Sequence, residues 1–224
     1  NDGDLDLYVA SDVDYLFRND GSETFVSVGA LLGLNDGIND NSAQWADYDN
    51  DGDLDLWVSA HNSSNNKLYL NKGDATFEGQ VGPGVGLNDA RGQASYGASW
   101  ADYDNDGDLD IYVPRYTAAN KLYRNDNSNG NKYLTVNLQG STFLDGSGAV
   151  VRGWVGGNQQ RRDVDGGSGY SAQGSHAVEF GYGATATLDS IVIDWPSGKH
   201  FDTTNVATNQ VLTIEEDLTL FTEF

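Results

Sequence analysis

One nine-residue sequence, DYDNDGDLD, occurs twice in this chain, at 47–55 and at 102–110. It places five carboxylates within nine residues, and like charges so close repel one another unless something neutralises them. The second half of the same sequence opens the chain as NDGDLD, and each copy continues into alternating apolar and polar residues. Such alternation is typical of a half-buried strand, so we expect repeated units of an acidic loop followed by a strand.

The repeat extends beyond the acidic loop. Aligning Asn1, Asn50 and Asn105 gives spacings of 49 and 55 residues, in the range of propeller blades and similar arrays. Each unit is read as about four short strands joined by Gly, Asn and Asp turns, without a helical period. We therefore predict an all-β repeat domain. The matching segments are LFRNDGSETF (16–25), LYLNKGDATF (68–77) and LYRNDNSNGN (122–131), with turns at GLNDG (33–37) and GLNDA (86–90).

The acidic loop has the chemistry of a calcium site. Calcium takes about 6–8 oxygen ligands, and Asp at alternate positions directs several carboxylates at one ion. Gly52 and Gly107, in the sixth place, allow the sharp turn. Positions 1, 3 and 5 supply side chains, position 7 supplies a backbone carbonyl, and position 9 closes the site from the next strand. The predicted ligands are Asp47, Asp49, Asp51, Asp53 and Asp55 in the first full site, and Asp102, Asp104, Asp106, Asp108 and Asp110 in the second.

A solvated acidic turn is the alternative explanation of such a charge run. Two identical copies, each with the Gly and each leading into a strand, favour calcium instead. A third, partial site is expected at Asp2, Asp4 and Asp6, which fill positions 5, 7 and 9 while the first two ligands are missing. We expect weak or no binding there unless upstream residues complete the site. The start within a repeat and the absence of Met indicate a processed chain or a fragment.

Charge and composition limit the partners. The 224 residues carry a formal net charge of -22, which argues against nucleic acid and anionic membranes as partners. No apolar run approaches the roughly 18 residues of a membrane-spanning helix, and the chain has no Cys for disulfides. Acidic residues are denser before the Asn-, Gly- and Ser-rich segment 125–132 than after it. This predicts two domains, 1–130 and 131–224.

The first domain resembles the FG-GAP or VCBS repeats of calcium-stabilised β-propellers. The resemblance rests on the acidic loops and on the strand–turn–strand LYLNKGDATF, and it covers 1–130. It implies a propeller, which closes with about 4–8 blades. Only two complete and two partial units fit here, so we expect partial or open propeller blades.

The second domain is similar to the ASPIC/UnbV module, which follows VCBS repeats in cartilage-acidic-protein-like chains. The resemblance rests on GSGYSAQGSHAVEFGYG (167–183), VIDWPSGK (192–199) and the NQVLTI ending, and FLDGSGAVV (143–151) departs from it. It implies a small β-sandwich without established chemistry. Strands are predicted at 132–138, 149–155, 176–183, 190–195 and 210–216.

The residues do not predict an enzyme. His61, His176 and His200 are scattered and lack the spacing of a metal or triad site. Three serines lie in a Gly-rich loop rather than in the strand–elbow–helix context of a hydrolase, and most paired carboxylates are explained as calcium ligands. The serines are Ser168, Ser171 and Ser175.

Three further features allow partner contacts. Arg152, Arg161 and Arg162 are the only basic concentration; they are expected either to pair across strands with Asp163 and Asp165 or to bind the acidic face of another copy. Asn62 begins a weak N-glycosylation sequon. The tail DLTLFTEF (217–224) alternates like a strand, and either packs on its own domain or pairs with an open sheet edge of a neighbour.

These features together predict a secreted, non-enzymatic calcium-binding protein with a structural or adhesive role. An open array with free strand edges favours contacts with other protein chains or with copies of itself, including a head-to-tail extracellular filament. The alternative is a carbohydrate- or protein-ligand-binding module of a larger secreted propeller protein, with glycans as ligands.

Overall fold

The structure is a computed structural model that describes residues 3–21, 24–35, 39–61, 65–79, 87, 94–141, 143–167, 169–217 and 220–222. These residues form eighteen strands in five sheets, and none of them lies in a helix. The described part of the chain accordingly contains no helix able to cross a membrane. The predicted all-β fold class is confirmed.

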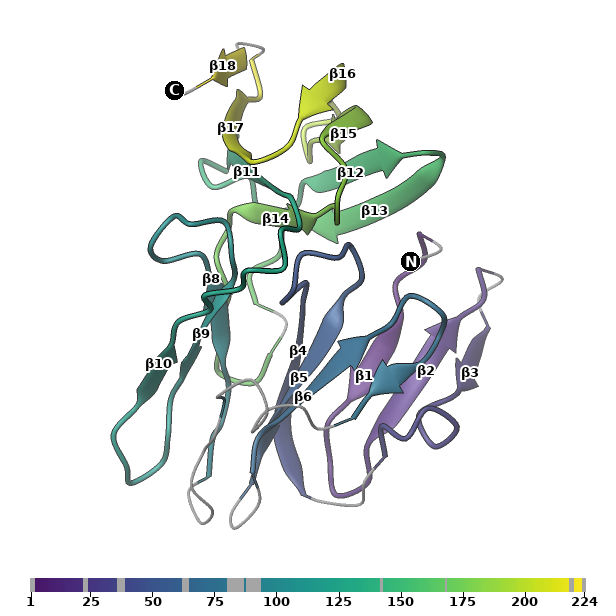
Figure 1. Cartoon of the computed structure of the whole chain (residues 1–224), viewed down its shortest axis with the longest axis vertical. Helices are drawn as coiled ribbons and strands as arrows, with labels where there is room; N and C mark the ends of the chain where they lie inside the picture. The colour runs from purple at the N-terminus through teal and green to yellow at the C-terminus, as the bar shows by residue number, and fades with distance from the viewer. Residues whose placement is uncertain are drawn as a thin grey trace.

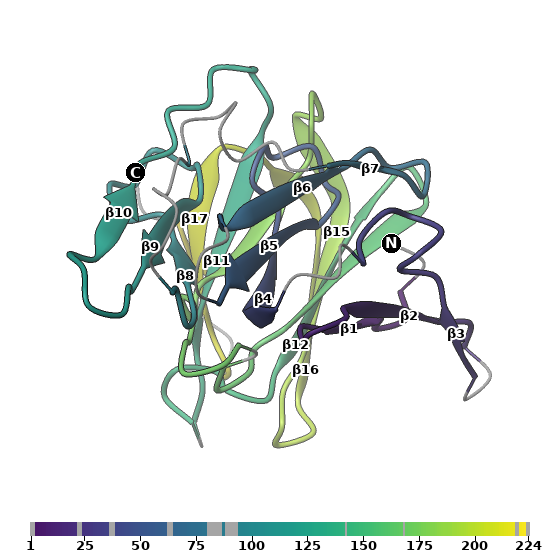
Figure 2. The ribbon, with the colours of Figure 1, turned by 90° about the horizontal axis from the view of Figure 1, so that it is seen from below.

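The first ten strands form three consecutive antiparallel sheets, here called blades 1, 2 and 3. Each blade is a simple meander because short Gly-, Asn- and Asp-rich turns join neighbouring strands. Figure 2 shows the three blades side by side. Blade 1 contains β1 (Leu7–Val9), β2 (Tyr15–Asn19) and β3 (Phe25–Ser27); blade 2 contains β4 (Asp40–Ala46), β5 (Asp55–Ala60), β6 (Lys67–Asn71) and β7 (Phe77–Glu78); blade 3 contains β8 (Ser99–Ala101), β9 (Asp110–Val113) and β10 (Lys121–Tyr123).

The cores of this array lie between the blades. Alternate residues of a strand point to opposite faces, so β5 contributes to both cores. Leu56 and Val58 pack in the cluster shared with blade 1, whereas Trp57 packs with Ile111 of blade 3. This explains why every residue of β5 is buried.

The outer faces of the array remain exposed. Leu7 of blade 1 is 51% exposed and Tyr112 of blade 3 is 41% exposed. The described sheets do not close into a barrel or a ring. The predicted open or partial set of propeller blades is therefore confirmed.

The remaining strands form a sandwich of two four-stranded sheets, with the orders β14-β11-β17-β18 and β13-β12-β15-β16. Their inner faces enclose one core that includes Leu134, Phe180 and Ile193. The sandwich lies at one end of the blades, with β13 and β14 nearest to them (Figure 1). Its strands are β11 (Tyr133–Gln139), β12 (Val150–Val155), β13 (Asn158–Asp163), β14 (Val178–Gly181), β15 (Thr187–Asp194), β16 (His200–Ala207), β17 (Gln210–Glu215) and β18 (Leu220–Thr222).

The sequence did not predict two of the sandwich strands. β13 and β16 are rich in polar residues and bury little of their surface, so they show no clear apolar alternation. Backbone pairing with β12 and β15 holds them in the sheet. The tail strand β18 pairs with β17, so the tail packs on its own domain as one alternative predicted.

Candidate metal centre

The first acidic loop connects β4 to β5 and gathers three carboxylates. One oxygen from each of Asp47, Asp49 and Asp55 lies within 4.8 Å of the others. Asp47 is only 2% exposed, and its Oδ2 accepts hydrogen bonds from the backbone N–H groups of Gly52 (3.1 Å) and Gly181 (2.9 Å). Its buried Oδ1 has no hydrogen-bond partner among the described residues. A buried carboxylate oxygen in this state is stabilised by a proton, a bound water or a cation.

The electrostatics of the loop show that burial makes the ionised form of these carboxylates costly. Burial, with smaller contributions from Asp51 and Asp49, raises the pKa of Asp47 to about 7 against the opposing effect of Arg162. Burial also raises the pKa of Asp55 to about 8. A bound divalent cation would reverse these shifts because it stabilises the ionised carboxylates.

The second loop, between β8 and β9, also gathers three carboxylates, which are more exposed to solvent. One oxygen from each of Asp102, Asp104 and Asp106 lies within 4.8 Å of the others. Asp102 accepts hydrogen bonds from the backbone N–H groups of Asp106 (3.1 Å) and Gly107 (2.9 Å). Both loops thus offer carboxylate oxygens without nitrogen or sulfur donors, and this set fits a hard cation such as calcium.

The aspartates at positions 5 and 7 do not belong to the carboxylate trio in both loops. Asp51 accepts a hydrogen bond from the backbone N–H of Asp53 (2.9 Å) and lies outside the first trio, whereas its counterpart Asp106 belongs to the second. Asp108 accepts a hydrogen bond from Asn50. The structure therefore brings six of the ten predicted ligands together into two trios, three in each loop.

The ninth-position aspartates have a second role that the sequence did not reveal. Asp55 accepts hydrogen bonds from the backbone N–H groups of Tyr48 (2.9 Å) and Asn71 (2.8 Å). Asp110 does the same with Tyr103 (3.0 Å) and Asn125 (2.7 Å). Each carboxylate therefore ties its loop to the end of the blade's next strand.

An asparagine completes this tie in all three blades. Its backbone N–H donates to the ninth-position Asp, and its side chain donates to the carbonyl of the preceding Leu. The pairs are Asn19 with Asp6 and Leu5, Asn71 with Asp55 and Leu54, and Asn125 with Asp110 and Leu109. We call this unit the Asp–Asn brace. Its signal in the sequence was the Asn that recurs at or just after the end of β2, β6 and β10.

The partial first copy lies in blade 1. Asp6 is part of the brace there, and Asp4 approaches Gly21 across the turn. Asp2 lies outside the described residues, so the structure does not address that predicted ligand.

The two acidic loops contact each other and the sandwich through Asn50. Its side chain donates to the carbonyl of Gly107 (3.0 Å) and to Asp108 (2.9 Å) in the second loop. Its carbonyl accepts a hydrogen bond from the backbone N–H of Gly183 (2.8 Å), just beyond β14. We call this contact region, together with the Asp47–Gly181 bond, the domain joint.

The three arginines lie on the sandwich. Arg161 forms a two-pronged pair with Asp163 at 2.8 and 2.9 Å. Both residues lie on β13, so this pair runs along one strand rather than across strands as predicted. Arg152 instead pairs with Asp194 of the neighbouring strand β15. Arg162 stacks over the ring of Phe180 at 5.0 Å and contributes a positive charge near Asp47. Arg162 therefore belongs to the domain joint.

The structure does not assemble the histidines and serines into one site among the described residues. His176 faces Asp145 at 3.3 Å and His200 faces Asp194 at 2.7 Å, while the backbone of His61 pairs with Asn39. Asn62 and Ser168 lie outside the described residues.

Two family comparisons match this architecture. The sequence model of the FG-GAP-like repeat matches residues 1–58 and 56–113. The chain belongs to the FG-GAP-like repeat family. The model named ASPIC and UnbV matches residues 140–219, which lie in the sandwich. Both predicted resemblances are confirmed.

This FG-GAP-repeat chain also has named relatives. It is 28% identical to human cartilage acidic protein 1 over 186 residues, covering 77% of the chain and 27% of the relative. It is 29% identical to mouse cartilage acidic protein 1 over 167 residues, covering 69% of the chain and 25% of the relative. The chain thus spans about a quarter of the length of the curated relatives it matches.

Proposed function

We propose that this chain is a non-enzymatic, calcium-stabilised structural or adhesion module of an extracellular protein. The observation that carries the proposal is the unpartnered Oδ1 of Asp47, buried within a trio of carboxylates. The surrounding oxygen atoms offer a hard cation the ligands it prefers. Asp47, Asp49 and Asp55 would hold one ion, and Asp102, Asp104 and Asp106 a second, with the other loop aspartates close by.

The role of calcium in this proposal is to remove the repulsion within each loop. The first loop joins β4 to β5 and contacts the sandwich, so an ion there would fix the blade turn and the domain joint together. A site with a Kd tenfold below the free calcium concentration adds about 1.4 kcal/mol of stability. This is a substantial share of a typical domain's stability.

An extracellular location is consistent with this chemistry. Extracellular calcium modules bind with Kd values of about 10⁻⁴–10⁻³ M, which millimolar calcium fills. The FG-GAP repeats and the similarity to cartilage acidic protein 1 support the same location.

The outer faces of the blade array support a role in assembly. Leu7 and Phe25 of blade 1 are 51% and 52% exposed, and Tyr112 and Leu122 of blade 3 are 41% and 53% exposed. Apolar side chains gathered on a sheet face favour contact with another protein surface. We propose other protein chains, including copies of this one, as the partners.

Calcium titration of the chelated protein tests the function. Isothermal titration calorimetry should show binding with Kd at or below about 10⁻³ M, and calcium should raise the melting temperature. Asp47→Asn should remove the first site, whereas Asp202→Asn on the exposed face of β16 should leave both readings unchanged. Equal melting temperatures with calcium and with chelator, and no binding heat, would refute the calcium proposal.

Sedimentation velocity tests the assembly role separately. Concentration-dependent self-association in calcium, weakened by Leu7→Ser and Tyr112→Ser, would support contacts through the outer faces. A monomer at all concentrations would contradict self-assembly while leaving the calcium proposal intact.

A further inference from the structure

The three blades repeat one pattern of contact between neighbours. In the strand that follows each copy of the acidic loop, an aromatic residue lies directly opposite a Leu of the next strand. Such opposite residues share one face of the sheet, and we call the two together a forward pair. The forward pairs are Tyr8 with Leu16 in blade 1, Trp57 with Leu68 in blade 2, and Tyr112 with Leu122 in blade 3.

The other face of each blade carries a second pair of apolar residues. They flank the aromatic residue of the forward pair along the strand, so they point to the opposite face of the sheet. We call them the rear pair. The rear pairs are Leu7 with Val9 in blade 1, Leu56 with Val58 in blade 2, and Ile111 with Val113 in blade 3.

Inside the chain, each forward pair packs against the rear pair of the following blade. One core cluster contains the forward pair of blade 1 and the rear pair of blade 2. A second cluster contains the forward pair of blade 2 and the rear pair of blade 3. Leu56 and Val58 are completely buried in this way, and so is Leu68. The repeated sequence therefore builds the same contact twice.

The two ends of the array each present one half of this contact. Blades 1 and 3 lie at the two ends of the row of blades (Figure 2). The rear pair of blade 1 and the forward pair of blade 3 are both exposed, although their counterparts in the other blades pack in the cores. Leu122 is 53% exposed, for example, against 5% for Leu16. One chain thus carries both complementary halves of an interface that it already uses internally.

We propose that the forward pair of blade 3 in one copy packs against the rear pair of blade 1 in a second copy. This inference rests on the assembly role proposed above, and it names the partner and the contact. Facing positions that combine a large aromatic with smaller aliphatic side chains interdigitate well. A contact between two rear pairs would instead bring only aliphatic side chains together and leave both aromatic forward pairs exposed.

The repeat also sets the size of the assembly. A contact that repeats the relation between neighbouring blades continues the same rotation, so it closes into a ring as a propeller does. Propellers close with roughly 4–8 blades, each copy contributes three, and about six is the only multiple of three in that range. The assembly is therefore a closed dimer with twofold symmetry.

The contact between copies is weaker than the two internal cores. Leu34 and Leu87 follow blades 1 and 2 and are buried in the internal clusters, whereas the chain after blade 3 continues into the Asn-rich segment 125–132, which has no Leu. The net charge of -22 on each copy also opposes association. Salt at about 0.15 M screens exposed charges beyond about 8 Å, so association is measured at that ionic strength.

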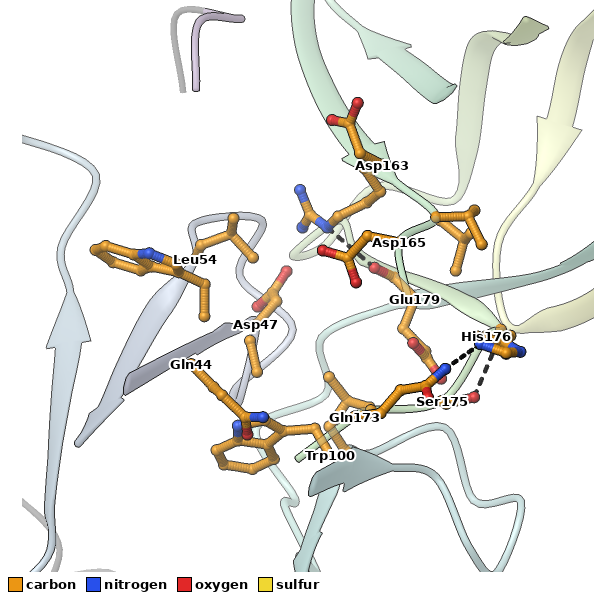
Figure 3. Close-up of a pocket in the computed structure, with 18 of the residues that line it drawn as sticks. Gln44, Asp47, Leu54, Trp100, Asp163, Asp165, Gln173, Ser175, His176 and Glu179 are labelled. Carbon is orange, nitrogen blue, oxygen red and sulfur yellow. Dashed lines mark hydrogen bonds between the residues drawn. The ribbon is translucent and has the colours of Figure 1, made fainter. Parts of the chain in front are cut away.

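The contact is separate from the candidate calcium ligands. Asp47 lines a cavity between the blades and the sandwich, together with Gln44, Trp100 and Glu179 (Figure 3). Leu7 and Tyr112 do not line this cavity and lie on the outer faces instead. Calcium titration of each variant below should therefore match that of the unmodified chain, so a loss of association is not a loss of calcium binding.

Cysteine cross-linking between copies tests the contact directly. The chain has no Cys, so Leu7→Cys and Tyr112→Cys chains each carry one thiol. In an equimolar mixture, a short bismaleimide should join Leu7→Cys to Tyr112→Cys in preference to joining either chain to itself. Leu144→Cys, on the sandwich and 84% exposed, replaces Leu7→Cys in the control mixture.

Two cross-linking results would overturn the contact while leaving the assembly role intact. One is equal joining of Tyr112→Cys to Leu144→Cys and to Leu7→Cys, which random collision would give. The other is preferential joining of Leu7→Cys chains to one another, which a contact between two rear pairs would give.

Sedimentation velocity of the full chain in calcium tests the closed dimer. The unmodified chain should pass from monomer to dimer with concentration and stop there. Leu7→Asp and Tyr112→Asp each place a carboxylate in the apolar contact, and both should raise the dimer Kd at least about tenfold. Leu144→Asp adds the same charge on the sandwich and should leave the Kd unchanged.

Three sedimentation results would contradict the proposal. Growth beyond the dimer would overturn the closed ring. A dimer that is weakened by Leu7→Asp but not by Tyr112→Asp would overturn the pairing of forward with rear faces. A monomer at every concentration would overturn the contact together with self-assembly, and the calcium proposal would stand.

Discussion

The Oδ2 atom of Asp47 accepts a hydrogen bond of 2.9 Å from the backbone N–H of Gly181, which lies 134 residues later in the chain. Asp47 follows β4 in the blades, and Gly181 ends β14 in the sandwich. The same carboxylate has its second oxygen buried in the first carboxylate trio. One side chain therefore serves both the candidate calcium site and the domain joint.

Gly181→Ala should weaken the joint. A Cβ there would lie 2.3 Å from Asp47 Oδ2 and 2.4 Å from the Cα of Asn50, so the backbone would have to move. We expect a loss of about 1–3 kcal/mol in the free energy of unfolding, measured by urea denaturation in calcium. Gly166→Ala is the control because a Cβ at Gly166 meets no atom within 4 Å. Equal free energies of unfolding for Gly181→Ala and Gly166→Ala would show that the backbone at Gly181 can move away from Asp47 and Asn50 without cost.

Asn50→Gly should weaken calcium binding at the second loop. The substitution removes the bonds from Asn50 to Gly107 and Asp108, while Gly tolerates the positive φ of 58°. Asn105→Gly is the matched control, since Asn105 occupies the same place in the second loop with a φ of 60°. Calorimetric titration of both variants checks the prediction, which fails if the two lose affinity at that loop equally.

The Asp–Asn brace should contribute more to the free energy of unfolding in the blade where it is more buried. Asn125 is 6% exposed, and its side chain also donates to the carbonyl of Tyr48 in blade 2 (2.9 Å). We expect Asn125→Ala to cost about 1–3 kcal/mol, with Asn71→Ala lower, and Asn19→Ala lowest because its partner Asp6 is exposed whereas Asp55 is buried. Chemical denaturation of the three variants gives the order. Equal losses of stability in the three variants would mean that burial does not determine how much these hydrogen bonds stabilise the fold.

Stability should depend on pH through Glu216. Hydrogen bonds from the hydroxyls of Ser141 and Ser197, with one from the backbone N–H of Ser141, lower the pKa of Glu216 to about 2. Because the folded pKa lies below the unfolded value, the stabilisation is complete above about pH 4.5 and is lost as pH falls through about 2.

Glu216→Gln provides the measurement for this pH effect. Its melting temperature should lie below that of the unmodified chain at pH 6, and the difference should vanish near pH 2. Glu215→Gln, one residue earlier on β17, serves as the control. A difference that stays constant with pH would contradict the role of the ionised carboxylate.

Local patterns in the sequence predicted several parts of this structure. The acidic loops, the strands that follow them and the central sandwich strands all depend on residues within about ten positions of each other, whose spacing fixes side-chain direction. β13 and β16 were missed because edge strands such as Asn158–Asp163 carry polar residues on both faces. Arg162 was predicted as a pairing or docking residue, and only its burial beside Phe180 placed it in the joint.

The sequence by itself determined the all-β repeats and the positions of the carboxylates, because alternation and Asp spacing act locally. The tertiary structure alone decided which oxygen of Asp47 is bonded and which is free, and it alone set Asn50 between the two loops. It also created the cavity beside Trp100 and Gln44. These features depend on contacts between residues far apart in the chain, since burial and hydrogen-bond partners are fixed only when the blades and the sandwich meet.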